Sequence, residues 1–458
     1  MILRRLAVAA ALVLVLPSAA RSDALDDYAR ARMEQLGLPG LAIAVLRNGD
    51  VSAMRTWGMA DLAKKTPVAR DTAFEVGSLS KQFTAVAVML LAEEGKLRVD
   101  ESIARYLPVP ESWAKITVRN LLTHSSGIRD YLADPDLAGR VHAAKDHGEV
   151  ERLLLEGSQL EFAPGDTWAY SNSGYLLLGC IVERVGGMPY GAFLEQRIFA
   201  PLGMRASGLS DGSKRTKAAR GYGIEEGKFV RRDPVPPNAF AAGGVVSTIA
   251  DMARWDAALH SGKLLTKESW SEIWTPLALA KGGTPPFRYG FGWVVDRHHG
   301  EKVVLHSGGT PGFSSAIRRH LGSGTTVIVL ANRGDRMIDH LAMEAGALLV
   351  PDLGRASIED PDPMRSVLLR RTMVDLLGGR PDPERFTPPM QLFLTTANGR
   401  GMAEWIASHG PLKSWAFAEG ERDGELRILR YRARLGNGDY WFTLALTKSG
   451  EIAQIYWW

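Results

Sequence analysis

The stretch GSLSKQF contains a serine and a lysine three residues apart, Ser78 and Lys81. On a helix, positions i and i+3 share a face, so the lysine amine can reach the serine oxygen. Unpaired amides and the positive dipole end at a helix N-terminus favour negative charge on that oxygen and on an oxyanion beside it. This geometry suits a serine nucleophile that forms an acyl-enzyme. The alternative is that Ser78 or Ser80 only caps the helix.

The same Ser-x-x-Lys spacing recurs at Ser112 and Lys115, and about one chance match is expected in a chain of this length. The surroundings separate the two matches. After Ser78, apolar residues recur at helical spacing as far as Gly95, which predicts a helix buried on one side. Ser112 instead follows the segment LPVPE. The sequence therefore favours Ser78 over Ser112 as the reactive serine.

A second candidate segment is Tyr170-Ser171-Asn172, and Tyr170 alone among the 11 tyrosines has an asparagine two residues later. Residues two apart in an extended loop point the same way. Tyr170 could exchange protons with the nucleophile and the leaving group, while Asn172 binds a substrate carbonyl and Lys81. The alternative is an aromatic ring that packs above a helix N-terminus capped by Asn172 or Ser173.

A third segment, VVLHSGG, predicts a strand that ends in His306, Ser307, Gly308 and Gly309. The glycines would let a ligand lie against the strand edge, and the Gly309 amide could donate to an oxyanion opposite the Ser78 amide. His306 would act through a hydrogen bond or its charge, or it is structural. The 10 histidines show no metal-ligand spacing, so we expect no metal and no other cofactor.

Strand-like segments at both ends of one region are expected to position these residues. A hairpin is predicted at Asn48-Gly49, a dipeptide suited to a tight turn between two strands. From Gly77 to about Trp274 the pattern is mostly helix and loop. Strand character then returns in the segments 289–295, 302–310, 313–320 and 325–332. We expect an antiparallel sheet formed from both ends, with an inserted helical lobe and a ligand cleft at their junction.

These three motifs, in this order, resemble those of the serine β-lactamase and penicillin-binding-protein superfamily. The resemblance is to the branch with class C β-lactamases, D,D-carboxypeptidases, D-aminopeptidases and esterases. It extends to the segments LLTHSSGI (121–128), FAPGDTWAYSNSGYLLLG (162–179), AAGGVVSTIADMARW (241–255), YGFGW (289–293) and HSGGTPGF (306–313). It implies an α/β, β-lactamase/transpeptidase-like domain over residues 25–350, an antiparallel sheet flanked by helices with an all-helical lobe.

The resemblance also implies roles for individual residues. Ser78 would be the acylated nucleophile, Lys81 its activating partner and Tyr170 the general acid and base. Asn172 would bind substrate and Lys81, and the amides of Ser78 and Gly309 would form the oxyanion hole. Glu161, which precedes Tyr170 by nine residues, is expected to be a solvent-facing loop residue rather than a deacylating base.

His306 and Gly308 stand where many relatives carry the motif Lys-Thr-Gly. A histidine that is mostly neutral near pH 7 is a poorer counter-charge for a substrate carboxylate, so strong β-lactam turnover is not expected. The function expected is a serine hydrolase acting on small amide, peptide or ester substrates of the D-aminopeptidase, D,D-carboxypeptidase or esterase type. The alternatives are a class C-like β-lactamase and a non-catalytic penicillin or cell-wall binding sensor.

The ends of the chain are expected to be separate units. Residues 1–24 contain Arg4, Arg5 and the apolar run 6–16, typical of an export signal too short to span a bilayer, so a secreted or periplasmic protein is expected. Without the signal the formal net charge falls from +4 to +2. So small a charge argues against a nucleic-acid partner. The oligomeric state stays open.

Past residue 350, the prolines and acids of residues 351–363 suggest a linker. Residues 364–458 suggest a small α+β domain, similar to the NTF2- or cystatin-like tails of some of these hydrolases. In that domain, Arg430, Arg432 and Arg434 alternate with apolar residues and are expected to form an exposed basic strand face. The single cysteine, Cys180, is expected to be buried and inert.

Overall fold

The computed structural model describes residues 18–156, 159–210, 217–298, 300–334, 338–350, 359–436 and 438–457. The basic and apolar parts of the predicted export signal, up to residue 17, lie outside these residues. From Ser18 the chain forms helix α1 (Ser18–Leu36).

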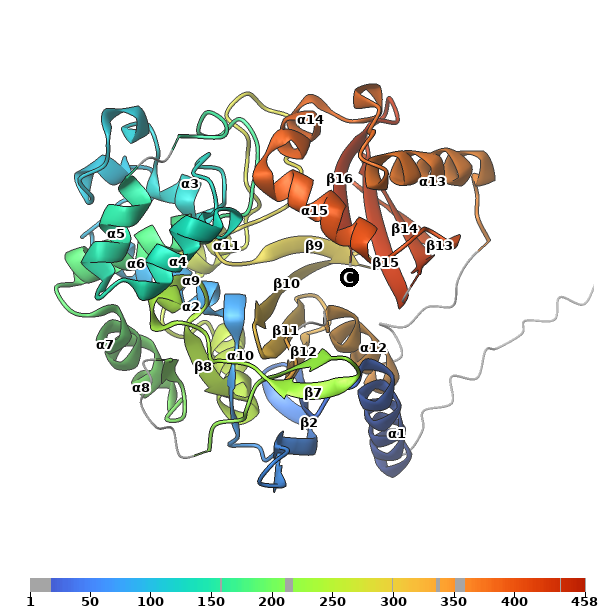
Figure 1. Ribbon diagram of the computed structural model, residues 1–458, viewed down its shortest axis with the longest axis horizontal. Coiled ribbons are helices and arrows are strands. Elements are labelled where there is room, and N and C mark those ends of the chain that lie inside the picture. The colour runs from blue at the N-terminus through green and yellow to red at the C-terminus, as the bar shows by residue number, and fades with distance from the viewer. Residues whose placement is uncertain are drawn as a thin grey trace, which may run out of the picture.

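The centre of the molecule is a seven-stranded antiparallel sheet with the order β3-β2-β1-β12-β11-β10-β9 (Figure 1). Its strands are β1 (Gly40–Arg47), β2 (Asp50–Asp61), β3 (Thr66–Pro67), β9 (Val294–His298), β10 (Glu301–Thr310), β11 (Phe313–His320) and β12 (Thr325–Ala331). Strand β1 pairs with β12 so that Ala44 lies opposite Ile328. The first hairpin and the four strands β9 to β12 therefore belong to one sheet, and the predicted fold class is confirmed.

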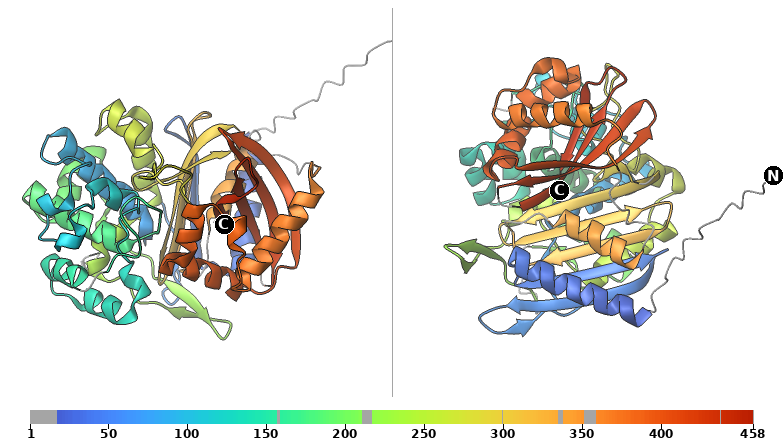
Figure 2. Two further views of the ribbon diagram at one scale, coloured as in Figure 1. Left: turned by 90° about the horizontal axis from the view of Figure 1, so that it is seen from above. Right: turned by 90° about the vertical axis from the view of Figure 1, so that its right-hand side faces the viewer.

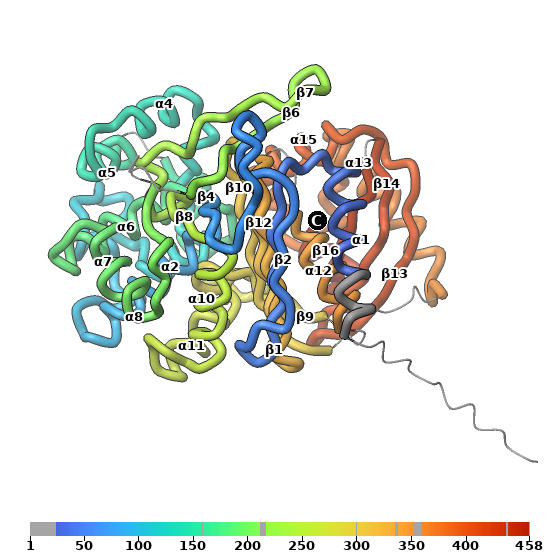
Figure 3. The backbone as a smooth tube through the Cα atoms, turned by 90° about the horizontal axis from the view of Figure 1, so that it is seen from below, coloured from blue at the N-terminus to red at the C-terminus, as the bar shows by residue number. Residues whose placement is uncertain are grey.

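Both faces of this sheet are covered, which explains why β1 is buried over seven of its eight residues. Helices α1 and α12 (Asp339–Leu349) pack on one face, with Leu25 and Ala29 of α1 in the core (Figure 2). The helical lobe packs on the other face, with α2 (Ser80–Glu93) and α10 (Ile249–Ser261) against the strands (Figure 3).

The rest of the lobe consists of short helices and small strands. Its helices are α3 (Val118–Leu122), α4 (Pro135–Ala143), α5 (His147–Leu155), α6 (Asn172–Gly186), α7 (Tyr190–Leu194), α8 (Ala200–Leu202), α9 (Phe240–Gly243) and α11 (Lys267–Ile273). Its strands are β4 (Ala73–Glu75), β5 (Gly208–Leu209), β8 (Val245–Thr248), β6 (Tyr222–Glu225) and β7 (Lys228–Arg231). Cys180 lies buried in α6, where burial raises the pKa of its thiol, as expected for an inert residue.

The C-terminal region is a small α+β unit, as predicted. It contains α13 (Pro363–Leu377), α14 (Pro388–Thr395) and α15 (Ala397–Ser408), then a four-stranded antiparallel sheet of β13 (Ser414–Asp423), β14 (Leu426–Leu435), β15 (Gly438–Leu446) and β16 (Ile452–Trp457). The domain boundary stays a prediction, since residues 351–358 of the expected linker lie outside the described residues.

This C-terminal unit shares a hydrophobic core with the hydrolase-like region, because Trp168 and Tyr289 pack in one cluster with Phe393 and Tyr431. Arg430 is 1% exposed, so the predicted basic strand face is wrong at this position. Its guanidinium lies 2.6 Å from Glu421 and 3.6 Å from Asp296 of β9. Arg432 and Arg434 are exposed.

No helix in the described part of the chain combines the length and apolar content needed to cross a bilayer.

Candidate active site

The reactive serine predicted from sequence lies at the turn before α2. Gly77–Leu79 form a 3-10 turn that leads directly into the helix, and neither Ser78 nor Ser80 caps it with its side chain. The Ser80 hydroxyl is buried, donates to the Gly77 carbonyl at 2.6 Å and accepts from the Val245 amide at 2.9 Å. Ser80 therefore stabilises the turn, while Ser78 faces a cavity.

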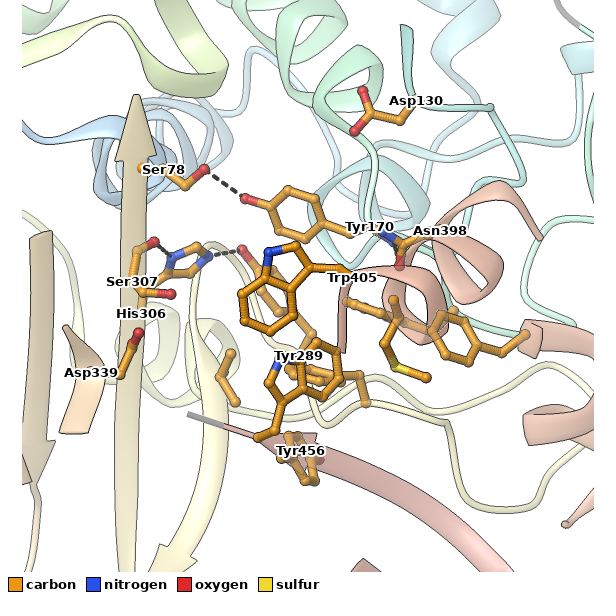
Figure 4. A pocket seen from close by; sticks show the side chains of 18 of the residues that line it. Ser78, Asp130, Tyr170, Tyr289, His306, Ser307, Asp339, Asn398, Trp405 and Tyr456 are labelled. Carbon is orange, nitrogen blue, oxygen red and sulfur yellow. Dashed lines mark hydrogen bonds between the residues drawn. The ribbon is translucent and has the colours of Figure 1, made fainter. Parts of the chain in front are cut away.

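Two polar side chains predicted from sequence contact Ser78, and a third contacts Lys81. The Oγ of Ser78 lies 3.1 Å from Lys81 Nζ and accepts a hydrogen bond from Tyr170 OH at 2.9 Å (Figure 4). Lys81 Nζ also lies 2.8 Å from Asn172 Oδ1 and 2.7 Å from the carbonyl of Ala242. Segments more than 160 residues apart along the chain thus converge on one lysine.

The surroundings of Lys81 determine how it can handle protons. Burial lowers the pKa of Lys81 to about 7, and the negative charge of Asp130 opposes this shift. Asn172 Nδ2 donates to Asp130 Oδ2 at 2.8 Å, so its Oδ1 faces the lysine. The Oδ1 of Asn172 and the carbonyl of Ala242 can only accept hydrogen bonds. A neutral amine has two N–H donors for these acceptors, and its lone pair then faces Ser78 as a proton acceptor.

Tyr170 approaches the serine from the other side. Burial raises the pKa of its phenol well above the ordinary value, so it stays protonated and can donate to Ser78. Its ring packs 4.2 Å from the ring of His124, whose Nδ1 accepts from the Ser171 amide at 3.1 Å. The backbone amide of Tyr170 donates to Asn398 Oδ1 of α15 at 3.4 Å. The Tyr170 loop is thus held by the helical lobe and by the C-terminal unit.

The third predicted segment supplies an open strand edge beside Ser78. Strand β9 pairs with β10 from Glu301 to Leu305, and among the described residues no strand pairs with the edge from His306 to Thr310 on that side. Thr310 and Phe313 flank a two-residue loop. Hydrogen-bonded and non-hydrogen-bonded residue pairs alternate along an antiparallel ladder, and the pair that flanks a two-residue loop is hydrogen-bonded. The Gly309 amide, one residue earlier, therefore points away from β11 toward the open edge. This is the direction an oxyanion donor requires.

Glycines allow the serine turn to lie against this edge. Gly77 has a φ of +52°, and a Cβ there would lie 2.7 Å from the Gly309 nitrogen. A Cβ at Gly308 would overlap the Val76 carbonyl oxygen. Both positions therefore need glycine to bring Ser78 and Gly309 together.

His306 lines the cavity but carries no charge. Its Nε2 lies 2.7 Å from Tyr289 OH and its Nδ1 lies 2.6 Å from the Ser307 carbonyl. Burial, with the positive charge of Lys81, lowers the pKa of His306 to about 3. The carbonyl can only accept, so Nδ1 carries the proton and Nε2 accepts from Tyr289. The strand end thus offers a substrate carboxylate no positive charge.

Sequence reasoning missed several residues of this site. Asp130, which orients Asn172, has no spacing signal, although it follows the quoted segment LLTHSSGI by two residues. Tyr289 lies in the quoted segment YGFGW and holds His306. Glu161 does not simply face solvent as expected, because its carboxylate accepts from the Ala397 amide at the start of α15 at 2.7 Å. Among the described residues, no group of acidic, histidine or cysteine side chains could hold a metal ion.

The family model described as Beta-lactamase matches residues 25–350 of this chain. The chain belongs to the beta-lactamase family. The match spans the sheet, the lobe and all the site residues predicted from the motifs, so the resemblance seen in the motifs is confirmed.

Relatives of this chain include a penicillin-binding protein and a D-aminopeptidase. Penicillin-binding protein 4* of Bacillus subtilis is 31% identical over 309 residues, which cover 64% of this chain and 67% of the relative. D-aminopeptidase of Brucella canis is 28% identical over 337 residues, covering 71% of this chain and 63% of the relative. The family thus includes hydrolases as well as penicillin-binding proteins.

The fold extends beyond the hydrolase-like region. The octameric penicillin-binding protein homologue of Pyrococcus abyssi matches 94% of this chain and 94% of its own, with a TM-score of 0.65 and 23% sequence identity. This likeness concerns the fold, and it includes the C-terminal unit.

Proposed function

We propose that this protein is a serine hydrolase in which small amide, peptide or ester substrates acylate Ser78 and water then releases the acyl group. The observation that carries the proposal is the position of Ser78 Oγ, within hydrogen-bond distance of both Lys81 Nζ and Tyr170 OH. A pure binder would not need two proton-transfer groups at one serine. The D-aminopeptidase relative supports hydrolysis as the outcome.

The proposed reaction has two halves. In the first, the Ser78 proton passes to Lys81 as Oγ bonds to the substrate carbonyl carbon, and the amides of Ser78 and Gly309 bind the oxyanion. The bond to the leaving nitrogen or oxygen then breaks as Tyr170 gives that atom a proton, and Lys81 returns its proton to Tyr170. In the second half, water adds to the acyl carbon, loses a proton to the same pair of residues, and Ser78 leaves protonated.

Labelling of the serine tests the nucleophile. After incubation with a fluorophosphonate, intact-protein mass spectrometry should show one adduct, and peptide mapping should place it on Ser78. Ser78→Ala should remove the adduct, and Ser112→Ala, the matched control, should keep it. An adduct on Ser112, or none with any acyl donor, would overturn the assignment.

A substrate panel separates the reaction types. Turnover of p-nitrophenyl acetate, nitrocefin, D-alanyl-p-nitroanilide and a D-Ala-D-Ala peptide would identify an esterase, a β-lactamase, an aminopeptidase or a carboxypeptidase. The neutral His306 favours weak nitrocefin turnover. A stable Ser78 adduct without turnover of any of the four would instead favour a sensor.

Export is part of the same proposal. The basic residues Arg4 and Arg5 and the apolar run 6–16 support a cleaved signal and a secreted or periplasmic protein. N-terminal sequencing of the protein from the periplasm or the medium should find a start near residue 25.

A further inference from the structure

The cavity at Ser78 has walls from two regions of the chain. It has a volume of about 570 Å³, and Ser78, Tyr170 and Gly309 line one part of it. The C-terminal unit contributes further walls through Asn398, Gly401, Met402 and Trp405 of α15 and Tyr456 and Trp457 of β16 (Figure 4). A substrate acylating Ser78 would therefore contact the C-terminal unit.

These walls are largely aromatic. The rings of Trp168 and Phe287 stack with centroids 4.6 Å apart, and Phe287 lies 4.3 Å from Tyr456. Trp405 and Trp457, from α15 and β16, lie 6.2 Å apart. Such a surface favours an apolar or aromatic group on the substrate.

The charges in the cavity are of one sign. Asp130, Asp296 and Asp339 line it, while no lysine or arginine is among the lining residues in the described part of the chain. Asp130 accepts from Asn172, and Asp296 lies 3.6 Å from the Arg430 guanidinium. Of these three carboxylates, Asp339 is the one whose negative charge is least balanced by neighbouring groups.

Asp339 is the first residue of α12, and its Oδ2 is shielded from solvent without a hydrogen-bond partner among the described residues. Burial raises the pKa of Asp339 to about 6, against the lowering effects of the Ser307 side chain and the charge of Arg318. At neutral pH it is therefore mostly ionised. A shielded carboxylate oxygen without a donor is costly, and a ligand ammonium would supply that donor.

The position of this carboxylate relative to the reacting carbonyl follows from the strand. Ser307, whose side chain lies near the Asp339 carboxylate (Figure 4), is two residues before Gly309 on the open edge of β10. Two residues of a strand span roughly 7 Å. A group bound at Asp339 would thus lie about one substrate residue away from the carbonyl held at Gly309.

We propose that Asp339 forms a subsite for a substrate ammonium group next to the scissile bond, so that the cavity selects apolar acyl donors with a nearby ammonium and rejects those with a nearby carboxylate. This inference rests on the proposed function of Ser78. It divides the possible substrates by charge, because D,D-peptides and β-lactams carry a carboxylate near the scissile bond.

Three phenylacetate esters of similar size test the inference. The alcohols are 2-(dimethylamino)ethanol, glycolamide and glycolic acid, which present an ammonium, a carboxamide and a carboxylate in turn. The wild-type protein should prefer them in that order, with kcat/KM at least about tenfold higher for the ammonium than for the carboxylate ester. Equal or reversed values would overturn the inference.

Asp339→Asn should reduce the ratio of kcat/KM between the ammonium ester and the carboxylate ester to about threefold or less. The change should lie in KM, because the substitution removes the charge and keeps the shape of the side chain. The carboxamide ester should stay within about twofold of wild type, which also reports that the variant is folded. Glu344→Gln, on the same helix but bound to Tyr28 and Arg32, is the matched control and should keep the full range. An equal loss for all three esters in Asp339→Asn would mean a structural role and would overturn the subsite.

Fluorophosphonate labelling separates this inference from the proposed function. A normal Ser78 adduct with the wrong ester order contradicts the subsite alone. No adduct and no hydrolysis of any ester contradicts the serine hydrolase, and the subsite with it.

Discussion

Ser78-Lys81 and Ser112-Lys115 have the same spacing and opposite surroundings. Ser112 and Lys115 are both exposed, on a 3-10 turn (Glu111–Trp113) and just after it. Lys81 is 0% exposed and contacts Ser78, Asn172 and the Ala242 carbonyl. Burial brings the pKa of Lys81 to about 7, whereas Lys115 lies in contact with water. The proposed chemistry therefore depends on the enclosure of the pair rather than on its spacing.

The strongest test of this comparison is removal of each serine in turn. Ser78→Ala should lower kcat/KM for p-nitrophenyl acetate by about 10⁴-fold or more, because no nucleophile remains. Ser112→Ala should stay within about twofold of wild type. Comparable losses in both variants would contradict the distinction between the two sites.

Removal of the phenol oxygen should have the next largest effect. Tyr170→Phe keeps the ring against His124 and loses the donor to Ser78. We expect kcat to fall by about 10²- to 10³-fold, since general acid catalysis is lost, with little change in melting temperature. Tyr222→Phe is the control, because Tyr222 is not among the residues that line the cavity and its hydroxyl accepts from the Leu62 amide. A Tyr170→Phe variant as active as this control would exclude the proposed acid.

The pH dependence tests whether burial of Lys81 matters. Lys81 must be neutral to accept the Ser78 proton, so kcat/KM should rise with pH through about 7, the pKa of Lys81. The charge of Asp130 raises that pKa, so Asp130→Asn should move the rise to lower pH. Asp136→Asn, an exposed control on α4, and Asp339→Asn should leave it in place. A shift to higher pH in Asp130→Asn would contradict the assignment.

The smallest expected effect concerns the C-terminal wall of the cavity. Trp405→Ala should lower kcat/KM for a p-nitrophenyl phenylacetate by about fivefold, which corresponds to about 1 kcal/mol of lost apolar contact. Acetate ester turnover should change less than about twofold, because a methyl group does not reach α15. Trp441→Ala, whose ring lies 4.8 Å from the Arg432 guanidinium, is the control. Equal losses for both esters would mean that Trp405 only supports the fold.

Local patterns predicted most of the secondary structure. Asn48-Gly49 does form the hairpin turn between β1 and β2, and both residues have a positive φ. Thr248 caps α10 by accepting from the Asp251 amide at 3.0 Å, an interaction between residues three apart in the chain. In the C-terminal unit, α14 and α15 are separate helices, because Thr396 caps a new helix at the Gly399 amide.

The sequence by itself determined the strand and helix periods, the glycines of the serine turn and the three motifs that identify the family. These depend on neighbouring residues and on backbone sterics, which are readable along the chain. Tertiary structure alone decided that Asp130 orients Asn172, that Arg430 is buried against β9 and that α15 and β16 line the cavity. Charge burial and cavity walls arise where distant segments exclude water together, and no local spacing encodes that exclusion.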